Sequence, residues 1–156
     1  MKKTENAMET TIKKYGLIPL STKNRLLITD VICYLFVLLF VYTAAGKLIT
    51  IETFKDVLTK YPLLSGYSTI IAYLIPVSEL LVATLLIIPA TKKYGIIASL
   101  GLMTLFITYI IYMFVTKSSL PCSCGGIISK LSWQQHIWFN SIFVLLALLA
   151  LKIYKK

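Results

Sequence analysis

The chain has 156 residues, of which 58% are hydrophobic and 14% are charged, and its formal net charge is +10. Because an ordinary soluble domain carries about a quarter charged residues, this composition argues against a water-soluble globular protein. Lipid can face apolar side chains directly, so the composition predicts an integral membrane protein whose main partner is the lipid bilayer. The positive charge does not indicate nucleic acid, since no basic face with interleaved aromatic residues occurs.

Residues 1–25 are polar and basic, and we expect them to form a cytoplasmic tail. The apolar run that follows, 26–46, is the first predicted membrane span. A cleaved signal peptide is the competing interpretation, but its apolar region has only about 7 to 15 residues. The greater length of this run favours a span that the protein retains.

Three further apolar runs cover residues 69–90, 95–115 and 133–154. Each is close to the roughly 20 residues that an α-helix needs to cross a bilayer. The predicted fold class is therefore an all-α membrane protein, with a bundle of four transmembrane helices forming one domain over residues 26–156. Only residues 91–94 separate the second and third spans, which predicts a tight antiparallel hairpin.

A short amphipathic helix is expected between the first and second spans, over residues 50–62. Thr50 is a candidate N-cap, Glu52 suits the first turn, and Pro62 ends the helix. We expect this helix to lie on the outer membrane surface and either to pack across the helix ends or to dock a partner. Its apolar residues recur at helical spacing: Ile51, Phe54, Val57, Leu58 and Tyr61.

The orientation follows from the lysine and arginine residues, which concentrate on the cytoplasmic side of membrane proteins. With four spans, the side that holds both termini carries eleven basic residues and the other side carries five. We therefore expect both termini in the cytoplasm of a multi-pass protein of the cell (inner, cytoplasmic) membrane. The five are Lys47, Lys55, Lys60, Lys117 and Lys130.

The second outer loop, 116–136, carries most of the chemistry. Cys122 and Cys124 lie one residue apart, between a proline and a Gly-Gly turn. Thiols on the outer side of the membrane meet oxidising conditions. Ser132 and Gln135 form a capping box, which predicts that the fourth helix begins at Trp133.

Three chemistries fit the pair Cys122 and Cys124. A redox-active dithiol is favoured, because a disulfide across so small a ring is strained and easily reduced. A structural disulfide and soft-metal ligation, with Cu(I) as the ion, are the alternatives. His136 is the only histidine, and it is either the base that stabilises the thiolate or an interfacial polar residue.

Two ionisable residues lie within or beside the predicted spans. Glu79 falls near the middle of the second span, where an unpaired carboxylate is costly, so it should face the bundle interior. A proton relay, an ion pair with Lys47, and a structural hydrogen bond that fixes helix packing are the open roles. Cys33, in the first span, is expected to be a small packing residue on the cytoplasmic side.

The segments YTAAGKLITIETFKDVL and IPVSELLVATLLI resemble the DoxX-like superfamily of redox-associated membrane proteins. The element from Cys122 to the sequence GGIISKLSWQQHIWFN is similar to the methylamine-utilisation MauE branch. The resemblance implies a four-helix membrane domain linked to maturation of a disulfide-rich enzyme subunit. It also implies that Cys122 and Cys124 are the reactive pair, and that Lys47 and Glu79 match the polar positions of the family.

These observations predict a membrane protein that supports thiol–disulfide exchange on the outer side. If it is an enzyme, it is a thiol–disulfide oxidoreductase with Cys122 and Cys124 as catalytic residues and His136 as their partner. The partner protein would be thioredoxin-like or otherwise cysteine-containing. The electrons need an onward acceptor or donor, for which a membrane quinone and a thioredoxin-like protein are the two candidates, and neither is visible in the sequence. A non-enzymatic assembly factor and a small metal-handling or transport protein are the alternatives.

Overall fold

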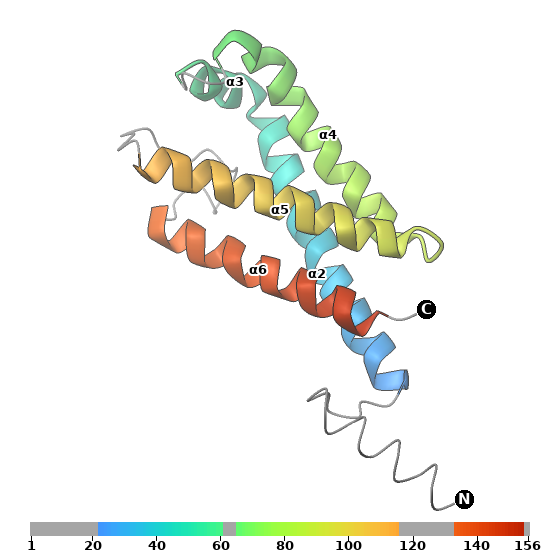
Figure 1. Ribbon diagram of the computed structural model, residues 1–156. Helices are drawn as coiled ribbons and strands as arrows, with labels where there is room; N and C mark the ends of the chain where they lie inside the picture. Colours follow the sequence, from blue (N-terminus) through green and yellow to red (C-terminus); the bar gives the residue numbers. More distant parts are fainter. Residues whose placement is uncertain (1–21, 61–64, 116–132, 155–156) are drawn as a thin grey trace, which may run out of the picture.

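A computed structural model describes residues 22–60, 65–115 and 133–154 of the chain. Every regular element in these ranges is helical (Figure 1). The order along the chain is α2 (Thr22–Ile49), α3 (Ile51–Thr59), the 3-10 turn η1 (Ser65–Tyr67), α4 (Ser68–Ile87), α5 (Lys92–Val115) and α6 (Trp133–Ile153).

Four of these helices, α2, α4, α5 and α6, are long and apolar enough to cross a membrane. The predicted bundle of four transmembrane helices, with a short helix between the first and second spans, is therefore confirmed. Helix α2 begins at Thr22, before the apolar run starts at Leu26. The reason is that a backbone helix continues through polar flanks as long as its own hydrogen bonds are made.

The four long helices run antiparallel to their sequence neighbours, and α2 packs mainly against α4 while α5 packs mainly against α6 (Figure 1). Phenylalanine rings from α2 and α6 meet in the core, with 5.2 Å between the centroids of Phe36 and Phe143. Large apolar side chains such as Leu38 and Leu145 are exposed on the outside of the bundle. That arrangement suits a protein whose surroundings are lipid.

The hairpin between α4 and α5 is as tight as the sequence predicts. Residues 88–91 join the helices, and the Thr91 hydroxyl donates to the carbonyl of Leu85 over 3.0 Å. Gly95 lies directly against α4, so an added Cβ atom there would be only 2.8 Å from the backbone nitrogen of Leu86. Glycine thus allows the two helices to approach closely at this end of the bundle.

Helix α3 buries Phe54, Val57 and Leu58, and these side chains pack against Ala72 of α4. The predicted amphipathic pattern is therefore confirmed for the described residues, while Tyr61 and Pro62 lie outside them. Thr50 occupies the N-cap position of α3, as predicted, but its side chain makes no capping hydrogen bond. Its hydroxyl instead donates to the carbonyl of Gly46 over 2.8 Å, because that carbonyl at the end of α2 also needs a donor.

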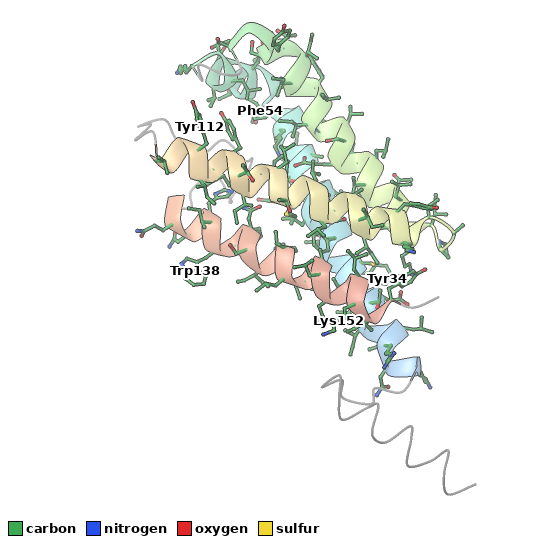
Figure 2. The ribbon with its side chains drawn as sticks, in the orientation of Figure 1. Tyr34, Phe54, Tyr112, Trp138 and Lys152 are labelled. Carbon is green, nitrogen blue, oxygen red and sulfur yellow. The ribbon has the colours of Figure 1, made fainter. Side chains whose placement is uncertain are left out.

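Helix α6 begins at Trp133, as the predicted capping box requires, although Ser132 itself lies outside the described residues. Trp138 is 73% exposed and projects away from the bundle (Figure 2). It lies five residues into the helix, close to the end at which α2 and α5 terminate. Such a placement is typical of the aromatic side chains that gather near the membrane–water interface.

Candidate functional site

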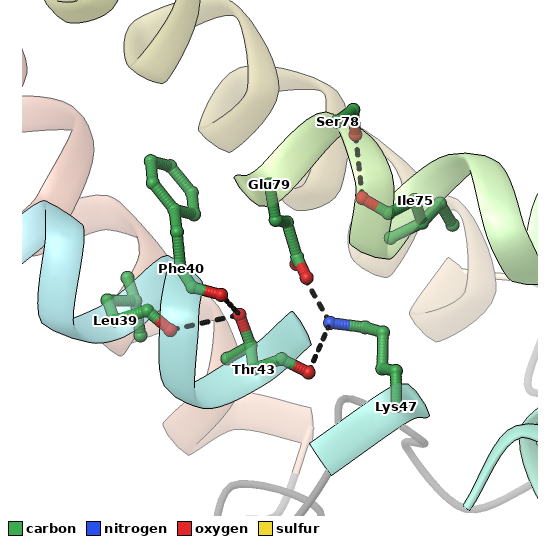
Figure 3. Close-up of polar contacts among 7 residues, drawn as sticks. All are labelled: Leu39, Phe40, Thr43, Lys47, Ile75, Ser78 and Glu79. Atoms are coloured by element: carbon green, nitrogen blue, oxygen red, sulfur yellow. Dashed lines mark hydrogen bonds and ion pairs between the residues drawn. The ribbon is translucent and has the colours of Figure 1, made fainter. Parts of the chain in front are cut away.

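An ion pair between α2 and α4 lies in the interior of the bundle. The Lys47 ammonium is 2.8 Å from Oε1 of Glu79, and the two side chains are only 6% and 1% exposed. Figure 3 shows both side chains pointing toward each other across the gap between the two helices. The ion pair that the sequence suggested as one of three roles for Glu79 is thus present in the structure.

The local sequence explains how Lys47 can be held in an apolar environment. Lys47 lies in the last turn of α2, where the partial negative charge of the helix terminus favours a cation. Its ammonium also donates to the backbone carbonyl of Thr43 over 3.5 Å. The Thr43 hydroxyl is itself bonded to the carbonyl of Leu39 over 3.0 Å, so each of these polar groups has a partner (Figure 3).

Glu79 is carried by a helix that contains a proline one turn earlier. Pro76 is buried within α4 and has no N–H group to donate to the preceding turn. Nearby, the Ser78 hydroxyl donates to the carbonyl of Ile75 over 2.7 Å and so keeps its own polar group paired (Figure 3). Glu79 therefore faces the interior, while the neighbouring polar side chain, Ser78, makes its hydrogen bond within α4.

The two remaining spans add one residue each to this part of the interior. On α5, the ring centroid of Phe106 lies 5.9 Å from the Lys47 ammonium, within the range of a cation–π contact. On α6, His136 is only 2% exposed, so its side chain is buried in the bundle as well. We call Lys47, Glu79, Phe106 and His136 the Lys47 cluster.

His136 is placed by the first turns of α6. The side-chain amide of Asn140, one turn further along, donates to the backbone carbonyl of His136 over 2.9 Å. Asn140 is itself 5% exposed, so this face of α6 presents two polar residues to the interior. The side chain of His136 is therefore turned toward the interior, and its role, as thiolate partner or as interfacial polar residue, stays a prediction.

The other predicted reactive residues, Cys122 and Cys124, lie in segment 116–132, outside the described residues. Their reactivity, and the expected action of His136 on their thiolates, stay predictions. In the sequence, segment 116–132 connects α5 to α6, and His136 follows it in the first turns of α6.

Cys33 lies in the apolar core at 4% exposure, as expected for a packing residue. Near it, toward the other end of the bundle, Lys92 of α5 is 2.7 Å from Asp30 of α2. Sequence reasoning missed this second ion pair. The signal that could have predicted this ion pair is Asp30, a lone aspartate in the first apolar run, together with Lys92 at the start of the third.

The described residues contain no group of three or more His, Cys, Asp or Glu side chains arranged to hold a metal ion. The metal-handling alternative rests on Cys122, Cys124 and His136, of which only His136 is described. What the described part of the chain does provide is a paired acid and base at membrane depth, next to a buried imidazole.

Comparison with known families gives one match over most of the chain. The sequence model of the family described as methylamine utilisation protein MauE matches residues 25–153. No curated protein and no solved structure matches the chain. The matched range includes all four spans, the Lys47 cluster and the cysteine pair.

Proposed function

The chain belongs to the MauE family, and from that premise we propose that it supports thiol–disulfide exchange at the outer face of the cell membrane. Cys122 and Cys124 are the reacting pair. The observation that carries the proposal is the Cys-x-Cys spacing in the sequence between the third and fourth spans of a four-span protein. The exchange serves disulfide formation or electron transfer during maturation of extracytoplasmic proteins.

The reaction proceeds by attack of a thiolate on a disulfide sulfur. When the pair is oxidised, its S–S bond breaks as the S–S bond of the partner forms, and two electrons and two protons pass from the partner's two thiols to Cys122 and Cys124. The partner is a thioredoxin-like or other cysteine-containing protein outside the cytoplasm. His136 is the described residue best placed along the chain to assist deprotonation, since a neutral imidazole accepts a proton.

The orientation that this reaction needs is supported by charge. The side with both termini holds eleven of the sixteen lysine and arginine residues, which favours the cytoplasm for that side. Segment 116–132 then faces outward, where thiols are oxidised rather than kept reduced.

Thiol trapping in membranes tests this function. The Cys124→Ser variant should retain Cys122 as an attacking thiol that cannot resolve a mixed disulfide, so a covalent partner accumulates. The double variant Cys122→Ser/Cys124→Ser should insert normally and capture no partner, and Cys33→Ser is the matched control that should behave as wild type. A pair that stays in one redox state under both oxidising and reducing growth conditions contradicts the proposal.

A non-enzymatic assembly factor is the second candidate, favoured by the exposed charged face of α3, where Glu52 and Lys55 form a surface pair. In that case the double cysteine variant would lower stability but leave the maturation of the partner intact. If the double cysteine variant inserts normally but the partner no longer matures, the result supports the redox function against this alternative.

A further inference from the structure

Two buried atoms of the Lys47 cluster have no hydrogen-bond partner among the described residues. They are Oε2 of Glu79 and Nδ1 of His136, on side chains that are 1% and 2% exposed. A buried polar atom left unpaired carries most of its desolvation cost, so native proteins rarely leave such atoms empty. The two atoms belong to different helices, α4 and α6, and both side chains are buried in the interior of the bundle.

Other buried polar side chains in the described part of the bundle behave differently. Thr29 donates to the carbonyl of Arg25 over 2.9 Å, and Ser99 donates to the carbonyl of Gly95 over 2.8 Å. Each of these hydroxyls is satisfied within its own helix. Oε2 of Glu79 and Nδ1 of His136, by contrast, have no partner within their own helices or on the other described helices.

The chemistry of the cluster restricts the ligand. Glu79 Oε2 needs a donor, while Nδ1 of a neutral His136 donates or accepts according to its tautomer. Lys47 has three N–H donors and uses two of them, on Glu79 and on the carbonyl of Thr43. A simple anion is disfavoured, because Glu79 already neutralises Lys47. The ligand must both accept and donate hydrogen bonds and carry no net charge.

An aromatic side chain borders the ion pair, since the ring centroid of Phe106 lies 5.9 Å from the Lys47 ammonium. A lipid-soluble ligand is suited to residues inside a membrane-spanning bundle. A planar ring with oxygens at opposite ends would supply both kinds of hydrogen bond. Its carbonyl oxygens in the oxidised form would accept from Lys47, and its hydroxyls in the reduced form would donate to Glu79.

We propose that the Lys47 cluster binds the head group of a membrane quinone, with Glu79, Lys47 and His136 as its hydrogen-bonding residues. This rests on the proposed function, because reoxidation of Cys122 and Cys124 needs an electron acceptor, and the quinone is the acceptor that we assign to it. Reoxidation of the dithiol breaks two S–H bonds and forms one S–S bond, releasing two electrons and two protons. The quinone takes up both electrons and two protons, and its two carbonyl groups become hydroxyls.

Photolabelling of the full-length protein in lipid nanodiscs tests the proposal, with an azido-substituted 1,4-benzoquinone as the probe. The protein should carry Cys122→Ser and Cys124→Ser, so that binding is measured without thiol chemistry. We expect saturable labelling of peptides that contain Glu79, Phe106 or His136, and competition by unlabelled decyl-ubiquinone. His136→Leu should weaken the apparent affinity by about tenfold, since one hydrogen bond in a buried site is lost.

A second variant guards against misfolding. Lys47→Met/Glu79→Leu replaces the ion pair by apolar residues of similar size, which a bundle tolerates, and should abolish saturable labelling while the protein remains folded. Asp30→Asn/Lys92→Gln, at the other ion pair, is the matched control and should label as wild type.

Labelling that does not saturate, or that is equal in all variants, reports partition into lipid and overturns the quinone site. That outcome leaves the thiol-trapping result standing, because mixed disulfides form without a quinone. Loss of thiol trapping with saturable labelling intact would instead contradict the thiol function alone.

Discussion

Helix α2 carries an ion pair in each half, and the two pairs differ in their surroundings. Toward its end, Lys47 and Glu79 are 6% and 1% exposed, whereas near its start Asp30 and its partner Lys92 are 46% and 19% exposed. The distances are similar, at 2.8 and 2.7 Å. The two ion pairs therefore differ in burial and not in the distance between their charged atoms.

The difference matters because the energy of an ion pair depends on what surrounds it. A buried pair gives up hydration for both charges, and removal of one partner leaves the other uncompensated. A partly exposed pair keeps contact with water or lipid head groups, and its net contribution is small. Asp30–Lys92 thus acts as a link between α2 and α5, whereas Lys47–Glu79 holds polar groups at membrane depth.

The largest expected effect comes from breaking the buried pair on one side only. Glu79→Leu should lower the free energy of unfolding by about 3 to 5 kcal/mol, because the Lys47 ammonium is then buried without a counter-charge. Unfolding in mixed detergent micelles measures this. The double variant Lys47→Met/Glu79→Leu should recover most of the loss, and a double variant no more stable than the single one would contradict the explanation.

The close approach of α4 and α5 gives the next effect. Gly95→Ala should destabilise the protein by about 1 to 3 kcal/mol, since the new Cβ atom meets the α4 backbone and the hairpin must open. Gly101→Ala is the matched control, because an added Cβ atom there has nothing within 4 Å. The same unfolding assay compares them, and equal stability of the two variants would show that the contact with Leu86 does not restrict the hairpin.

A smaller effect is expected at the exposed pair. Asp30→Asn should cost at most about 1 kcal/mol, and added salt should reduce the difference from wild type because accessible charges are screened. A double-mutant cycle with Lys92→Gln isolates the coupling. A coupling as large as that of Lys47 and Glu79 would mean that burial does not separate the two pairs.

The smallest effect concerns the surface pair of α3. The hydrogen bond to Glu52 raises the pKa of Lys55 above its ordinary value. The pair therefore stabilises the fold fully below the pKa of the unfolded lysine, and this contribution is lost as pH rises through the raised pKa.

Replacing Glu52 by Gln should bring the pKa of Lys55 down. A side-chain NMR titration of Lys55 in micelles measures the change. Asp56→Asn should lower it less, because Asp56 acts on Lys55 only through weaker electrostatic attraction. An unchanged titration in the Glu52 variant would show that the bond is absent in solution.

Hydropathy was sufficient to predict the four spans, since bilayer thickness fixes how long an apolar run must be. The short helix α3 was predicted from apolar residues that recur at helical spacing. The cost of a lone carboxylate in lipid also indicated that Glu79 faces inward and could pair with Lys47. By contrast, the inward turn of His136, the approach of Phe106 and the bond from Thr50 to Gly46 depend on how helices rotate and pack. A single sequence does not contain that information when most positions on every face are apolar.

Labelling of introduced and native cysteines in intact cells tests most directly whether the reacting thiols face outward. In a Cys33→Ser background, after mild reduction, a membrane-impermeant maleimide should modify Cys122 and Cys124 from outside. The same reagent should not reach a cysteine introduced by Lys3→Cys unless the membrane is broken. Labelling of the Lys3→Cys position in intact cells, with the cysteine pair protected from the reagent, would show that the orientation is the opposite one. The basis for extracytoplasmic thiol exchange would then be lost.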